Sequence, residues 1–127
     1  MLLFDTSALI ELESELANRT VGAVRNYLGR NLGSDMACST VSVGELASGS
    51  DETLTQVLLR KLRKISLTEA VAYRAALLDK AQSIKGQRLG ENDTWIAATA
   101  IHYSATLVHL DRDFLRIAGL KQVFLRK

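Results

Sequence analysis

Acidic side chains follow two short apolar segments of the chain, at the point where each segment ends. Residues 2–4 (LLF) run into Asp5, and the segment TLVHL runs into Asp111. Each segment has the length and composition of a buried strand. If the two strands are parallel neighbours in one sheet, their carboxyl ends lie at the same edge, and the two carboxylates converge there.

Two further carboxylates fall in predicted helices. Asp93 lies just inside the start of a helix that Asn92 is expected to cap, where the positive end of the helix dipole favours an ionised carboxylate. Glu45 lies in the apolar helical stretch TVSVGELA. A carboxylate on the inner face of a helix is costly unless it is paired or holds a metal. The position of Glu45 therefore favours a functional site over a solvated helix face.

Four carboxylates in one pocket would repel one another and could not all stay ionised unaided. A divalent cation resolves this conflict, and an all-oxygen set of ligands suits Mg²⁺ or Mn²⁺. Zinc is disfavoured because Cys38, His102 and His109 show no zinc-ligand spacing. A bound Mg²⁺ or Mn²⁺ orients a water, lowers its pKa and stabilises the transition state of phosphoryl transfer. The predicted chemistry is therefore metal-assisted phosphoryl transfer to water.

Several of these residues also have a purely local explanation. Asp5 can cap the helix that follows it, Asp93 can belong to an ordinary helix start, and Asp113 can be a turn residue. These alternatives stay open at the level of the sequence pattern.

The elements that must position these side chains alternate between extended and helical segments. The predicted strands are 2–4, 36–39, 65–67, 105–109 and 123–125, and the predicted helices are 6–17, 20–29 (or to 33), 40–47, 53–62, 68–86 and 94–103. Thr6 or Ser7 is expected to cap the first helix, Thr20 the second and Thr68 the fifth, with Glu15 on the outer side of the first. Strands separated by helices predict an α/β fold with a mainly parallel sheet.

Composition bounds the class of protein. The chain has 127 residues, which predicts one domain over residues 1–127. Its net charge of +2 does not by itself imply nucleic-acid binding, and the single cysteine excludes an internal disulfide. The N-terminal segment meets Asp5 early and lacks a basic flank, so we expect neither a signal peptide nor a membrane anchor. We therefore expect a cytoplasmic protein that does not associate with membranes.

Four segments, in this order and spacing, carry a resemblance to a known family: LLFDTSALIE, TVSVGELASG, GENDTWIAATA and LVHLDRDFLRI. Together they resemble the PIN domain, and more narrowly the VapC-type toxins of bacterial and archaeal toxin–antitoxin systems. The resemblance extends from residue 2 to about residue 125. It implies a PIN-like three-layer α/β/α sandwich around a central parallel sheet of four to five strands.

The resemblance also implies an activity and partners. The expected protein is a Mg²⁺- or Mn²⁺-dependent endoribonuclease that hydrolyses RNA phosphodiesters with a metal-activated water and acts as the toxin of a toxin–antitoxin pair. The expected partners are RNA, a cognate antitoxin and a second copy of the chain, as a homodimer or within a hetero-oligomer. The apolar positions Leu9, Leu12, Val57, Leu58 and Leu62 exceed what one small core needs, and the resemblance suggests a groove there for an antitoxin tail.

The resemblance assigns roles by motif. The expected catalytic and metal-binding residues are Asp5, Glu45, Asp93 and Asp111. The residues expected to support them or to contact substrate are Thr6, Ser7, Asn92, His109 and Asp113. Independently of the resemblance, three basic residues near the acidic positions are candidates for contacts with RNA phosphates, namely Arg88, Arg112 and Arg116.

Two residues depart from the family pattern. His109 stands where the family usually has threonine, so its role is open between a contact to phosphate or water and a buried histidine at a strand end. Trp95 is bulkier than the usual aliphatic residue, and it either stacks on a base or packs between helices. The His109 departure keeps a second hypothesis alive, in which the chain is a catalytically weak PIN scaffold whose main role is to form a complex with an antitoxin.

Overall fold

The computed structural model describes residues 1–49 and 52–126. They contain one five-stranded sheet with the order β3-β2-β1-β4-β5, in which every neighbouring pair is parallel. The strands are β1 (Leu2–Phe4), β2 (Met36–Ser39), β3 (Arg63–Ile65), β4 (Thr106–His109) and β5 (Gln122–Phe124). The strand order reverses between β1 and β4, which places the predicted binding edge at their carboxyl ends.

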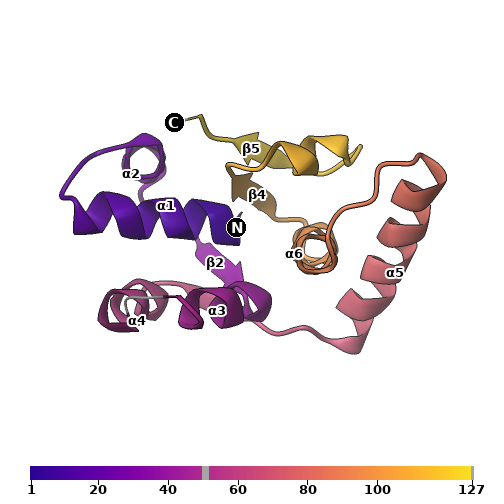
Figure 1. Cartoon of the computed structure of the whole chain (residues 1–127), viewed down its shortest axis with the longest axis horizontal. Coiled ribbons are helices and arrows are strands. Elements are labelled where there is room, and N and C mark those ends of the chain that lie inside the picture. Colours follow the sequence, from indigo (N-terminus) through magenta and orange to yellow (C-terminus); the bar gives the residue numbers. More distant parts are fainter. Residues whose placement is uncertain (50–51, 127) are drawn as a thin grey trace.

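Helices cover both faces of the sheet, so the predicted three-layer α/β/α architecture is confirmed (Figure 1). They are α1 (Thr6–Ala17), α2 (Ala23–Arg30), α3 (Thr40–Ala47), α4 (Glu52–Arg60), α5 (Glu69–Ile84) and α6 (Glu91–His102), with a short 3-10 helix, η1 (Arg112–Arg116), before β5. Figure 1 shows α1, α2 and α4 on one side of the sheet and α5 and α6 on the other.

The core is divided by the sheet into two apolar clusters. Leu3 and Leu107 belong to the cluster under α6, whereas the next residue of each strand, Phe4 and Val108, belongs to the cluster under α1, α2 and α4. This division follows from the strand, whose successive side chains point to opposite faces. Burial on both faces explains why the strands read as continuous apolar runs.

The start of α2 differs from the prediction. Glu15 is buried rather than outward, and its carboxylate accepts hydrogen bonds from the backbone N–H groups of Gly22 (2.8 Å), Val24 (3.1 Å) and Arg25 (3.0 Å). The prediction that Thr20 caps this helix is therefore wrong, because a carboxylate from α1 takes over that role.

Two helix caps and one strand also differ from the prediction. Asp5, not Thr6 or Ser7, is the cap of α1, and Gly90, not Asn92, is the cap of α6. β3 begins two residues earlier than predicted, and α5 is capped by Thr68 as predicted. Within the described part of the chain, no helix combines the length and the apolar character needed to cross a membrane.

Candidate active site

Asp5 lies at the carboxyl end of β1 and is only 2% exposed. The hydroxyl of Ser7 shares its proton between the two Asp5 carboxylate oxygens, at 2.7 and 2.8 Å, and the N–H of Ala8 donates to Oδ1 at 2.9 Å. Burial raises the pKa of Asp5 to about 6, although these hydrogen bonds lower it, and the charge of Asp93 raises it slightly further. The Ser7 hydroxyl also accepts from the N–H of Leu110 at 3.0 Å, which ties the end of β1 to the end of β4.

Glu45 approaches the same edge of the sheet from α3 and is half-buried. The hydroxyl of Thr6 donates to its Oε1 at 2.5 Å. The same hydroxyl is hydrogen-bonded to the hydroxyl of Ser42 at 2.9 Å. Thr6 thus fixes the direction of the Glu45 carboxylate and couples the first turn of α1 to α3.

Asp93 lies in the first turn of α6 and is half-buried. Its pKa is raised to about 6, first by burial and then by the negative charges of Asp111, Glu45 and Asp113. Negative charges raise the pKa of a carboxyl group only when they lie near it, so these three side chains are neighbours of Asp93. The structure therefore brings the four predicted carboxylates to one edge of the sheet, together with Asp113.

Both the carboxylate and the backbone N–H of Asp111 form hydrogen bonds within the site. Its Oδ1 accepts from the N–H of Asp113 at 2.9 Å, which makes Asp111 the cap of η1. Its own N–H donates to Nδ1 of His109 at 3.2 Å. An imidazole nitrogen that accepts carries no proton, so the proton of His109 is on Nε2.

His109 is fully buried at the end of β4. Its Nε2 donates to Oε1 of Gln122 at 2.8 Å, and the amide nitrogen of Gln122 donates to the carbonyl of Phe114 at 3.1 Å. Phe124 stacks on the imidazole with ring centres 5.6 Å apart. Burial lowers the pKa of His109, so the ring is neutral at physiological pH. Of the two roles left open by the sequence, this geometry matches the buried histidine.

The remaining predicted residues lie around the carboxylates. Asp113 pairs with Arg116 at 3.2 Å, and the guanidinium of Arg116 also donates to the carbonyl of Arg88 at 3.2 Å. The guanidinium of Arg112 lies 5.4 Å from the centre of the Phe124 ring. Asn92 is exposed within the first turn of α6.

Arg88 is turned to α5, where its guanidinium donates to both carboxylate oxygens of Asp79 at 3.1 and 3.2 Å. It is 64% exposed and Asp79 is 37% exposed. Arg88 thus pairs with a carboxylate of α5, whereas Arg116 pairs with Asp113 at the edge of the sheet.

The donor chemistry of this edge fits a divalent cation. Carboxylate oxygens are the ligands that Mg²⁺ and Mn²⁺ prefer, and a cation would offset the repulsion that raises the pKa of Asp93. Among residues 1–49 and 52–126, no three Asp, Glu, His or Cys side chains form a ready-made cluster that could hold a metal ion. The carboxylates are therefore coupled neighbours that repel one another rather than a closed cage.

Two supporting residues were missed by sequence reasoning. Ser42 lies three residues before Glu45 in a helix, and this spacing places both on one helix face, so it offered a signal. Gln122 offered none, because its role depends on the pairing of β4 with β5.

Comparisons with known proteins identify the family and the fold of this chain. The model of the PIN domain family matches residues 2–120. Ribonuclease VapC11 of Mycobacterium tuberculosis is 30% identical over 125 residues, which cover 94% of this chain and 93% of that protein. VapBC2 from Rickettsia felis, solved bound to a DNA fragment from its promoter, has a TM-score of 0.81 at 22% identity, with 98% of each chain covered. A toxin–antitoxin complex from Klebsiella pneumoniae has a TM-score of 0.76 at 25% identity, covering 97% of this chain and 96% of that chain.

Proposed function

This chain belongs to the PIN-domain family and is homologous to VapC ribonucleases, and we propose that it is a metal-dependent endoribonuclease that acts as the toxin of a toxin–antitoxin pair. The observation that carries the proposal is the group of coupled carboxylates at the carboxyl ends of β1 and β4, where burial and then the neighbouring charges raise the pKa of Asp93. The proposal treats residues 1–127 as one nuclease domain that acts on RNA in the cytoplasm.

The proposed metal ligands are Asp5, Glu45, Asp93 and Asp111. A bound Mg²⁺ or Mn²⁺ supplies the positive charge that neutralises the carboxylates, lowers the pKa of a water and stabilises charge on the reacting phosphate. The rest of the site holds these carboxylates in place. Ser7 orients Asp5 and Thr6 orients Glu45 through the hydrogen bonds described above.

The proposed substrate is an RNA strand that lies across this edge of the sheet. Hydrolysis forms a bond from the water oxygen to phosphorus and breaks the bond to the 3′-oxygen, which takes up a proton. The products therefore carry a 5′-phosphate and a 3′-hydroxyl. Arg112 and Arg116 on η1 are exposed beside Asp111 and Asp113, where they balance the negative edge and offer contacts to RNA phosphates.

The proposed partner is an antitoxin. It binds an apolar groove of about 390 Å³ between α1, α2 and α4, away from the carboxylates. Its lining includes the apolar residues singled out in the sequence, among them Leu12, Leu58 and Val57, the last of which is 45% exposed. Arg25 and Lys61 add positive charge to the lining. The groove fits an apolar segment flanked by acidic residues, and the likeness to solved toxin–antitoxin complexes supports this partner.

The proposed assembly is a homodimer or a hetero-oligomer with the antitoxin. The outer side of α5 exposes Tyr73, Leu77 and Ile84, at 67%, 66% and 87%. Exposed apolar side chains that gather on one helix are typical of an interface, which supports self-association.

Cleavage of total cellular RNA by the pure protein tests the function. We expect discrete fragments with Mg²⁺ or Mn²⁺, none with EDTA, and none from an Asp93→Asn variant that remains folded. The matched control is Asp35→Asn, which changes an exposed carboxylate paired with Arg63 at the other end of the sheet strands and should cleave like the parent. Equal cleavage by Asp93→Asn would contradict the proposal, and no cleavage with any metal would favour the antitoxin-binding scaffold.

A further inference from the structure

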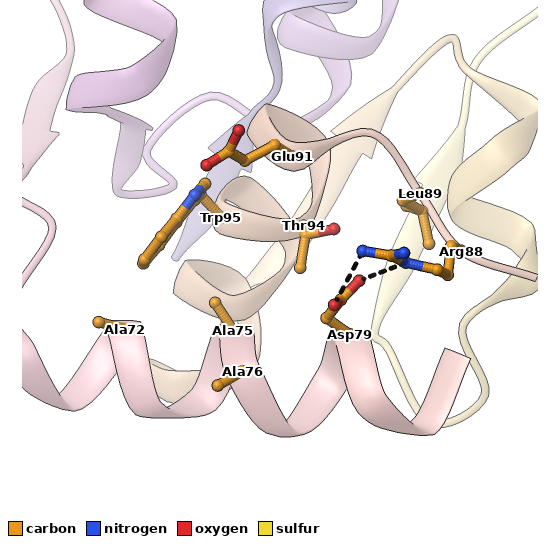
Figure 2. A pocket seen from close by; sticks show the side chains of 9 residues that line it. All are labelled: Ala72, Ala75, Ala76, Asp79, Arg88, Leu89, Glu91, Thr94 and Trp95. Atoms are coloured by element: carbon orange, nitrogen blue, oxygen red, sulfur yellow. Dashed lines mark hydrogen bonds and ion pairs between the residues drawn. The ribbon is translucent and has the colours of Figure 1, made fainter. Parts of the chain in front are cut away.

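A pocket of about 320 Å³ lies between α5 and α6, outside the carboxylate group. Figure 2 shows Trp95 at one end and the Arg88–Asp79 pair at the other, with Thr94 between them. Its floor consists of small side chains on α5, namely Ala72, Ala75 and Ala76. The shape is therefore a slot with one aromatic wall, a flat apolar floor and polar groups around the opening.

The pocket shares a helix turn with the proposed catalytic edge. Glu91, Thr94 and Trp95 line it, and all three lie within two residues of Asp93 at the start of α6. One helix turn rises only about 5 Å. Thr94 follows Asp93 directly, whereas Glu91 and Trp95 lie on the opposite flank of the helix. A strand with one phosphate at Asp93 therefore passes around the start of α6 to place a neighbouring nucleotide at the pocket.

Trp95 is half-buried, and of the two roles that the sequence left open for it, its contacts match packing between helices. It packs against Val71, Ala75 and Ala98, which anchor it between α5 and α6. It also lines the pocket, so an aromatic surface held in place by packing is available to a planar ligand. A ring fixed in this way loses little conformational entropy when a ligand stacks on it.

The charged side chains that line the pocket disfavour binding of a phosphate group. Arg88 is matched by Asp79 through its two hydrogen bonds. Glu91 adds a second carboxylate on the same helix face as Trp95, four residues before it. Two carboxylates against one guanidinium repel a phosphate group, whereas they accept hydrogen bonds from a neutral ligand that carries N–H groups.

We propose that this pocket binds one base of the RNA strand, at a nucleotide beside the scissile phosphate, and this inference rests on the proposed function. The base stacks on Trp95 and donates N–H groups to the Glu91 carboxylate. Guanine fits best, since its ring N–H and amino group lie side by side and match the two oxygens of a carboxylate. Uracil offers a single N–H flanked by two carbonyl oxygens, which the carboxylate repels. Stacking on aromatic side chains together with hydrogen bonds to base edges is the usual way proteins read single-stranded RNA.

The single tryptophan of the chain gives a direct probe, because all of its tryptophan fluorescence comes from Trp95. The experiment titrates the full protein, in EDTA to prevent cleavage, with a uridine pentamer and with the same pentamer carrying one central guanine. We expect saturable quenching, with the guanine pentamer bound roughly tenfold more tightly. Glu91→Gln should abolish that preference while quenching persists. Glu69→Gln, which changes an exposed first-turn carboxylate of α5 outside the pocket, should retain it.

Several outcomes would overturn the inference. They are the absence of quenching by either pentamer, equal affinity for both, and an unchanged guanine preference in Glu91→Gln. The result is separable from the proposed function. Metal-dependent cleavage without quenching would reject the pocket and keep the nuclease, whereas guanine-dependent quenching without cleavage would keep the pocket and reject the nuclease.

Discussion

Replacing Asp5 by asparagine is expected to stabilise the metal-free protein although it removes the activity. Burial raises the pKa of Asp5 from 3.8 to about 6, so the folded state disfavours the ionised carboxylate. A shift of about two units corresponds to roughly 3 kcal/mol at most, at about 1.4 kcal/mol per unit. Asparagine keeps the side-chain oxygen that accepts from the N–H of Ala8, and it caps helices about as well as aspartate. The hydrogen bonds from Ser7 and Ala8 are weaker to a neutral amide than to a carboxylate, and this loss offsets part of the gain. We therefore expect the free energy of unfolding to rise by about 1–3 kcal/mol.

The effect depends on pH with a defined sign. The folded pKa lies above the unfolded one, so the folded state binds more protons between about pH 4 and pH 6. The stability contribution of Asp5 in the parent protein therefore falls as the pH rises through this window. The Asp5→Asn variant lacks this change, so the stability gap between the two proteins should be small at pH 4 and complete at pH 8.

Thermal unfolding in EDTA at several pH values measures this gap. At pH 8 we expect the Tm of Asp5→Asn to exceed that of the parent by roughly 3–10 °C. Asp35→Asn is the control, because it breaks an exposed ion pair with Arg63 and should lower stability by no more than about 1 kcal/mol. A variant less stable than the parent at pH 8, or a gap that does not change with pH, would refute the view of Asp5 as a buried carboxylate that folding disfavours.

Three further changes test the supporting contacts and the groove. Thr6→Val removes the hydroxyl that orients Glu45, so metal-dependent cleavage should fall roughly tenfold to a hundredfold in a protein that unfolds at a similar temperature. His109→Leu leaves the N–H of Asp111 without its acceptor and should cost about 1–3 kcal/mol of stability in urea unfolding, and a metal titration should also show weaker Mn²⁺ binding. Val57→Asp places a charge on the rim of the apolar groove and should weaken antitoxin binding in a pull-down while cleavage is retained; unchanged binding would show that the antitoxin docks elsewhere.

Local pattern was enough to predict the sheet and the carboxylates at its edge. Apolar runs at 2–4 and 105–109 end in acidic residues, and parallel pairing of β1 with β4 brings those ends together. The cap of α5 at Thr68 followed from its own side chain in the same way. These features depend on residues that are close in sequence or on the general rule for parallel sheets.

Features that depend on residues far apart in the chain could not be predicted from the sequence. Glu15 caps α2 from α1 because the chain folds back, and a reading of the helix period alone places it in solvent. The buried His109 needs Gln122 from β5 as its partner, and nothing in the segment TLVHL indicates that partner. The role of Asp5, Glu45, Asp93 and Asp111 as metal ligands stays a prediction, since proximity of carboxylates is a matter of geometry and metal binding is a matter of affinity.

Calorimetric titration of the antitoxin-free protein with Mn²⁺ tests the central claim most directly. At pH 8 we expect saturable binding in the parent protein, weaker binding at pH 5.5 where protons compete for Asp5 and Asp93, and none in Asp93→Asn. The Asp35→Asn control should bind like the parent. Absence of Mn²⁺ binding by the folded parent protein, or equal binding by Asp93→Asn, would contradict the claim that these carboxylates form the metal centre of a ribonuclease.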